Sequence, residues 1–164
     1  MPTVTATPAK ASQIDTKLIL PFINSVKSVL KMMLGVETKI ERPRVKSVPG
    51  TEYDYSGIIS FSGNIVGTVV LSCKKDTAIK LVERFAGSEV PPDTSDFADA
   101  LGELTNMITG AAKKDLGAAA SISVPTVIMG KGHMVARPSD VPCLVIPCVT
   151  ELGEFAVEIS IKTV

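Results

Sequence analysis

The residues of this chain with the clearest chemical potential are an acid and an amide one helical turn apart, Glu103 and Asn106. A carboxylate can pair with a cation, and a neutral amide can hold a water molecule through one donor and one acceptor contact. Asp99 and Gly110 share their side if the segment is helical, because the four positions are spaced 4, 3 and 4 residues apart. The set can orient water beside a bound charge, or it can be an ordinary solvated surface.

The element that must carry these residues is a helix predicted from Asp93 to Ala120, with Thr94 or Ser95 as its N-cap. Acidic residues gather in its first turns and lysines in its last, as the helix dipole favours. Apolar residues recur at helical spacing and predict the face that packs on the core: Phe97, Leu101, Leu104, Ile108, Ala111 and Ala112. The Glu103/Asn106 row points roughly 180° to 200° away from this stripe, so we expect it to face solvent.

Two glycines interrupt the predicted helix, and each costs about 1 kcal/mol relative to alanine. Gly110 lies on the Glu103/Asn106 face, where it would leave a shallow notch that a partner can approach closely. Close packing within the protein is the alternative explanation, and it suits Gly102 better.

The pattern Asp99-x-x-x-Glu103-x-x-Asn106 on a long exposed helix resembles the marker of the CheC/CheX/FliY family of bacterial chemotaxis phosphatases. The resemblance covers about residues 15 to 162, and the single copy of the motif makes the chain most similar to the CheX members. It implies an enzyme that hydrolyses the aspartyl phosphate of a CheY-like response regulator. Asn106 would orient the attacking water and Glu103 would contact the lysine of the regulator's active site, with Asp99 and Gly110 at the partner interface.

The same resemblance implies that Mg²⁺ is bound by the regulator, that this chain binds no cofactor, and that it forms a homodimer. The sequence itself is compatible with a dimer but does not require one. Charged side chains on an edge strand oppose pairing with a second chain, and the final strand, Phe155 to Ile161, carries only one charge, Glu158. A non-catalytic module that binds a regulator or assembles as in a flagellar switch is the alternative function. A small-molecule sensor with a pocket between sheet and helix is a third.

Composition narrows the class of protein further. The 164 residues suit one domain, here residues 15–164 after a flexible tail of residues 1–14. A formal net charge of zero, without clustered Lys and Arg, argues against nucleic-acid binding. Residues 55–73 carry no charge, but Gly63-Asn64 divides them into a hairpin rather than a membrane span. Without an export signal, the cytoplasm is the expected location.

The sequence lacks the residue patterns of a metal site, of a nucleophilic hydrolase and of a phosphate-binding loop. His133 is the only histidine and has no second ligand at metal spacing, so no metal site is expected and a structural role is favoured. No Ser-His-Asp or Cys-His signature occurs, and Gly130-Lys131-Gly132 indicates a turn rather than a phosphate-binding loop. Three cysteines without a C-x-x-C pair fit buried thiols in a reducing compartment.

These elements predict an α/β (α+β) domain in which an antiparallel or mixed sheet of about six strands packs with two long helices and one shorter helix. The helices are expected at residues 15–34, 76–86 and 93–120, and the strands at 39–48 (a weak candidate broken by Pro43), 55–61, 65–73, 122–129, 143–150 and 154–162. In the last strand Phe155 starts an alternation that predicts one buried face and one mostly wet face.

Overall fold

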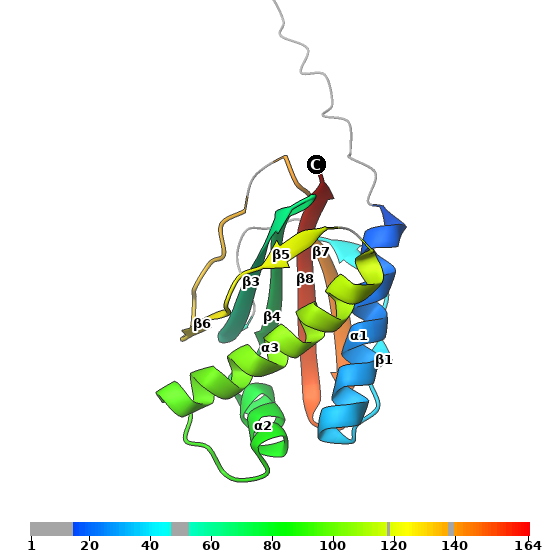
Figure 1. Ribbon diagram of the computed structural model, residues 1–164. Coiled ribbons are helices and arrows are strands. Elements are labelled where there is room, and N and C mark those ends of the chain that lie inside the picture. The colour runs from blue at the N-terminus through cyan, green and yellow to red at the C-terminus, as the bar shows by residue number, and fades with distance from the viewer. Residues whose placement is uncertain (1–14, 47–52, 118, 138–139) are drawn as a thin grey trace, which may run out of the picture.

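The computed structural model describes residues 15–46, 53–117, 119–137 and 140–164. Within these ranges three helices lie on one face of an antiparallel sheet (Figure 1): α1 (Thr16–Leu34), α2 (Lys75–Ala86) and α3 (Ser95–Leu116). The predicted α+β class, with two long helices and one shorter helix, is confirmed. The tail predicted at residues 1–14 lies outside the described residues.

The sheet has eight strands rather than about six. In chain order they are β1 (Lys39–Ile40), β2 (Arg44–Val45), β3 (Tyr55–Gly63), β4 (Ile65–Cys73), β5 (Ala120–Ile122), β6 (Thr126–Met129), β7 (Leu144–Thr150) and β8 (Gly153–Thr163). The main order is β1-β7-β8-β4-β3-β5, with β2 also paired to β7 and β6 to β3. Two predicted strands are each divided in two, at Pro43 and at Pro125, because proline lacks the N–H that a continuous ladder requires.

The helix boundaries follow local capping chemistry. The side chain of Thr94 accepts a hydrogen bond from the Phe97 N–H at 3.2 Å and so begins α3, as predicted. The prediction that this helix reaches Ala120 is wrong. Gly117 adopts φ 65° and ends the helix at Leu116, and Ala120 instead pairs with Gly63 in the sheet.

The core lies between the helices and the sheet. Of the predicted stripe on α3, Ala111 is half-buried and the other residues are buried, including Phe97 and Leu101, which are fully covered. Full burial of such a side chain contributes about 1.5–3 kcal/mol. The helix also comes very close to β3, since a Cβ added at Gly57 would collide with Oγ1 of Thr105. Packing therefore fixes both the depth and the rotation of α3 on the sheet.

The prediction that one face of the last strand is mostly wet is wrong. Of the side chains on β8 that point away from the helices, Ala156, Glu158 and Ser160 are buried, with Glu158 only 3% exposed, while Glu154 and Lys162 near the two ends are exposed. The Glu158 carboxylate pairs with Nζ of Lys46 at 3.0 Å and with the guanidinium of Arg137. Ser160 donates a hydrogen bond to the carbonyl of Val141 at 3.3 Å. Segments distant in sequence fold across this face and exclude water from it.

The premise of the edge-pairing argument is also wrong, because β8 is not an edge strand. It pairs with β4 on one side and with β7 on the other. The strands at the two margins of the sheet are β1 and β2, on β7, and β5 and β6, on β3. A dimer built by strand addition would have to use one of these margins.

Candidate functional site

The row of polar residues predicted from the sequence lies on the side of α3 that faces away from the sheet. Asp99 and Glu103 are exposed, and Asn106 and Gly110 are half-buried. Within the described part of the chain, no hydrogen bond or ion pair occupies the side chain of Glu103 or Asn106. The two functional groups thus stand one turn apart on a rigid helix with their polar atoms available to a partner.

Tyr55 of β3 holds the beginning of this helix through contacts with Asp93 and Phe97, which we call the Tyr55 strut. The hydroxyl of Tyr55 donates a hydrogen bond to Oδ1 of Asp93 at 2.6 Å, and the Tyr55 ring packs on Phe97 with centroids 5.5 Å apart. Burial, together with the adjacent carboxylate of Asp93, raises the pKa of Tyr55 to about 12. The phenol therefore stays protonated as a donor, and the strut fixes where α3 leaves its preceding loop.

The two helix glycines differ as their positions on the wheel predict. A Cβ added at Gly102 would lie 3.1 Å from Cγ of Pro125, so this glycine admits close internal packing. A Cβ added at Gly110 would meet nothing within 4 Å. Gly110 is therefore open space on the outer surface of the helix.

Two features beside the row were not assigned to the site from the sequence. Lys113 follows Asn106 by seven residues, as Asp99 precedes it by seven, so a cation and an anion lie on the same side about 10 Å either way along the axis. The seven-residue spacing is a signal in the sequence for Lys113, whose position near the end of the helix also complements the helix dipole. The second feature, Val124 next to Pro125, gives no signal until the packing of β5 and β6 on α3 is known.

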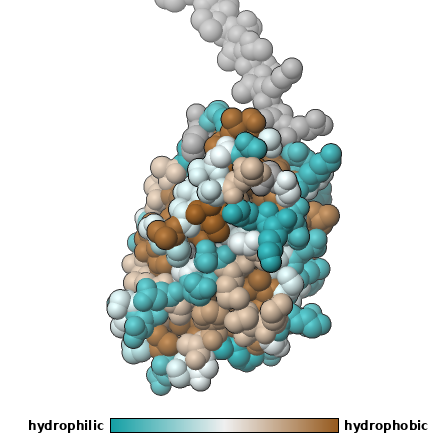
Figure 2. Space-filling model, viewed as in Figure 1, coloured by the Kyte–Doolittle hydropathy of each residue, from teal (hydrophilic) through white to brown (hydrophobic). Residues whose placement is uncertain are grey.

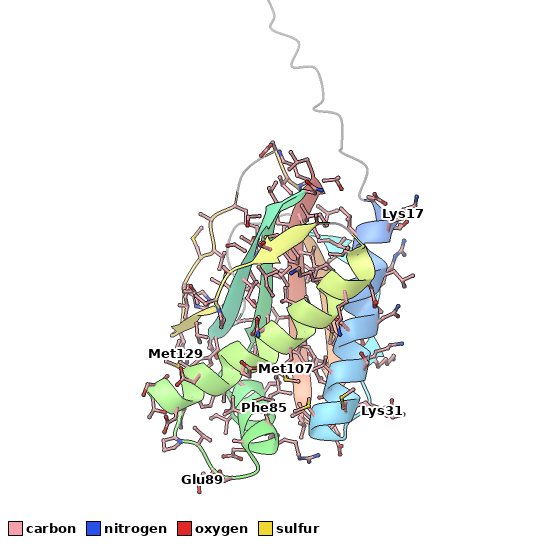
Figure 3. The ribbon with its side chains drawn as sticks, in the orientation of Figure 1. Lys17, Lys31, Phe85, Glu89, Met107 and Met129 are labelled. Atoms are coloured by element: carbon pink, nitrogen blue, oxygen red, sulfur yellow. The ribbon has the colours of Figure 1, made fainter. Side chains whose placement is uncertain are left out.

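The other flank of the row is apolar. Met107 of α3 and Phe85 of α2, labelled in Figure 3, are half-buried where the two helices meet. Figure 2 shows the same side of the molecule, where hydrophobic side chains form separate patches between hydrophilic ones. The polar row is thus bordered by apolar side chains, as at an interface that excludes water around a few polar contacts.

A concave site of the kind that binds small molecules lies elsewhere. One pocket between the first turns of α1 and the sheet is lined by Asp15, Leu18, Ile19, Val141, Leu144, Ile159 and neighbouring residues, and by none of the α3 row. The row itself is carried on the convex surface of a helix. Such a surface suits a macromolecular partner better than a small ligand.

The remaining titratable candidates have structural partners. Nδ1 of His133 lies 2.8 Å from the Gly130 carbonyl and Nε2 lies 2.7 Å from Oγ of Ser56, so the imidazole ties the turn to β3. Cys73 and Cys148 are buried free thiols, and burial raises the pKa of Cys148 to about 12. Cys143 is a free thiol but only half-buried.

The described ranges hold no group of three or more His, Cys, Asp or Glu residues placed to bind a metal ion. None of the helices in those ranges is long and apolar enough to cross a membrane.

This chain is similar in sequence and fold to known chemotaxis proteins. A curated relative, the CheY-P phosphatase CheX of Thermotoga maritima, is 28% identical over 91% of this chain and 98% of its own. The crystal structure of the chemotaxis protein CheX from Desulfovibrio desulfuricans is 30% identical and has a TM-score of 0.80, covering 90% of this chain and 99% of that one. The CheX–CheY–BeF3–Mg²⁺ complex of Borrelia burgdorferi has the same fold, at 24% identity and a TM-score of 0.73 over 88% and 97% of the two chains. The model of the chemotaxis phosphatase CheX matches residues 55–149, from β3 through α3 to β7, and with it the chain belongs to the CheX family.

Proposed function

We propose that this protein is a phosphatase that hydrolyses the aspartyl phosphate of a CheY-like response regulator in chemotaxis signalling. The observation that carries the proposal is the Glu103/Asn106 pair on the outer face of α3, with Glu103 exposed, Asn106 half-buried, and neither side chain bonded to another described residue. Membership of the CheX family and the T. maritima relative, a CheY-P phosphatase, support it.

Asn106 and Glu103 have different roles in the proposed reaction, which follow from their side-chain chemistry. The amide of Asn106 is too weak a base to take a proton, so its contribution is to hold one water in line with the phosphorus atom. That water attacks, the bond between phosphorus and the aspartyl oxygen breaks, and inorganic phosphate leaves the regenerated carboxylate. Glu103 pairs with the lysine of the regulator's active site and fixes the register of the two proteins.

Charge neutralisation comes from the substrate side in this proposal. Phosphoryl transfer through a loose transition state requires positioning and cations more than covalent chemistry. In the B. burgdorferi complex, CheX and CheY occur together with BeF3 and Mg²⁺. We infer that Mg²⁺ here belongs to the regulator and that this chain binds no cofactor of its own. Because the enzyme must meet its regulator, the cytoplasmic location expected from the sequence is part of the same proposal.

The proposal includes residues 15–164 as one catalytic domain that forms a homodimer. The margin formed by β5 and β6 lies beside α3, where Pro125 packs against Gly102, so a dimer that leaves the row free would pair at the other margin, formed by β1 and β2. Light scattering at increasing concentration tests this point. A mass that stays near 17.3 kDa at every concentration would mean a monomer.

The decisive experiment for the activity follows the decay of phosphorylated regulators from the same organism, with and without this protein. We expect faster decay with the wild type and a loss of about 100-fold or more with Asn106→Ala, because a misplaced nucleophile costs about that much. The variant should retain its fold and its affinity for the regulator, since Asn106 acts on water. If Asn106→Ala were as active as the wild type, the site would be wrong. A wild type that bound the regulator without hastening decay would be a binding module.

A further inference from the structure

An exposed apolar side chain projects beside the polar row, on the connection between β5 and β6. Val124 is 82% exposed, more than any other large hydrophobic residue in the described part of the chain. Exposed valines are ordinary at mobile positions, but this one is held firmly. Its neighbour Ser123 donates a backbone hydrogen bond to the Ser60 carbonyl at 2.9 Å and accepts one from the Ser60 N–H through its side chain at 2.9 Å.

The hydroxyl of Ser123 also donates a hydrogen bond to the Val124 carbonyl at 2.9 Å, which further restrains the segment. On the other side, Pro125 packs against Gly102, where a Cβ would lie 3.1 Å from its Cγ. The segment is thus fixed to β3 by hydrogen bonds and to α3 by packing. Val124 is a rigid apolar knob that needs no ordering before it binds.

The contact with Gly102 places this knob at the flank of the candidate site. Gly102 precedes Asn106 by four residues and follows Asp99 by three, so it is their neighbour on the helix surface at about 5–6 Å between Cβ positions. In Figure 1 the connection between β5 and β6 lies at the left of the sheet, above the N-terminal half of α3. A protein docked across Asn106 and the charged residues Asp99 and Lys113 would therefore come close to the segment that carries Val124.

We propose that Val124 is a specificity-determining contact for the phosphorylated response regulator, seated against an apolar surface of the regulator next to its aspartyl phosphate. The inference rests on the proposed function and goes beyond its residues. Asp99, which is exposed, and Lys113, which is half-buried, can select a partner by charge, but surface charges stay solvated and discriminate weakly. Val124 is a fixed apolar side chain beside this row, so it adds affinity only for a regulator whose surface is complementary in shape.

The test compares Val124→Ser and Val124→Asp with Val164→Ser. Val164 is a matched control because it is 81% exposed and directly follows β8, outside the connection between β5 and β6. Two quantities are measured: the Kd for the regulator bound to beryllofluoride and Mg²⁺, and kcat and KM for the phosphorylated regulator. We expect Val124→Ser to raise Kd and KM about tenfold with kcat within about twofold, Val124→Asp to raise them further, and Val164→Ser to change neither.

Unchanged Kd and KM in both Val124 variants would overturn the inference, as would equal losses in Val164→Ser. A fall in kcat alone would also overturn it, because it would show that Val124 acts on the chemistry rather than on recognition. Unchanged melting temperatures are expected, since the side chain touches mainly water. The Kd measurement separates this inference from the proposed function: a wild type without phosphatase activity contradicts the latter, while the shift in Kd still reports on Val124.

Discussion

Two polar faces in this molecule look alike in the sequence and end in opposite environments. One is the outer face of α3, with Glu103 exposed to solvent. The other is the face of β8 that points away from the helices, where Glu158 is 3% exposed and pairs with Lys46 and Arg137. Both were predicted to be wet because both alternate with an apolar face.

The difference teaches that periodicity identifies the apolar side of an element but does not decide whether the polar side meets water. Burying Glu158 costs desolvation, which two cations and their hydrogen bonds offset. Glu103 is exposed, so its carboxylate is not desolvated in the free protein and can pair with a cation of a partner. The same residue type is therefore structural in β8 and available for binding in α3.

The largest expected effect is on stability, at Glu158. Glu158→Ala leaves the buried cations Lys46 and Arg137 without their counter-charge, and we expect the free energy of unfolding to fall by about 3–5 kcal/mol. Urea denaturation measures this change. Glu154→Ala, on the same strand but exposed, is the control and should change stability by no more than about 0.5 kcal/mol. Similar losses in the two variants would contradict the contrast between the faces.

Glu103→Ala is expected to show the reverse pattern. Its stability should match that of the wild type, because the carboxylate has no partner within the described residues. Affinity for the activated regulator should fall by about 2–5 kcal/mol, since the pair with the regulator's lysine becomes desolvated on docking. Isothermal titration calorimetry measures this loss. Unchanged affinity would remove Glu103 from the interface.

The glycines of α3 give a smaller pair of opposite effects. Gly102→Leu forces a side chain against Pro125 and should destabilise the protein by about 1–3 kcal/mol. Gly110→Leu enters open space and should stabilise the helix by up to about 1 kcal/mol, while blocking the approach of the regulator. Thermal melting and binding assays on both variants check this. A Gly110→Leu protein that melted early yet still bound would assign Gly110 to internal packing.

The smallest effect concerns the strut beneath α3. Tyr55→Phe removes the hydrogen bond to Asp93 and should cost about 1 kcal/mol at neutral pH. The pKa of Tyr55 is about 12 in the folded protein and about 10 when unfolded, so its contribution is complete below pH 10 and declines as the pH rises towards 12. The gap in stability between wild type and variant should therefore narrow over this range. Urea denaturation measures the two free energies of unfolding. If their difference stayed constant from pH 8 to pH 11.5, the hydrogen bond from Tyr55 to Asp93 would not contribute to stability.

The sequence by itself determined the features that depend on near neighbours. Capping by Thr94, the apolar stripe through Phe97 and Leu101, and the spacing of Glu103 and Asn106 fix a helix and its outward side within a few turns of chain. The hairpin of β3 and β4 follows in the same way from its β-branched residues and its Gly63-Asn64 turn. Local propensity and periodicity suffice for these because every interaction that they involve is short in sequence.

Only the tertiary structure decided the rest. The burial of Glu158 depends on Lys46, which is separated from it by 112 residues, and the alternation within β8 carries no information about that contact. The same holds for the place of β8 inside the sheet and for Val124, whose position beside α3 is set by Pro125 packing on Gly102. Whether a polar surface is solvated or covered depends on which distant segment folds over it, and one element's sequence does not specify that segment.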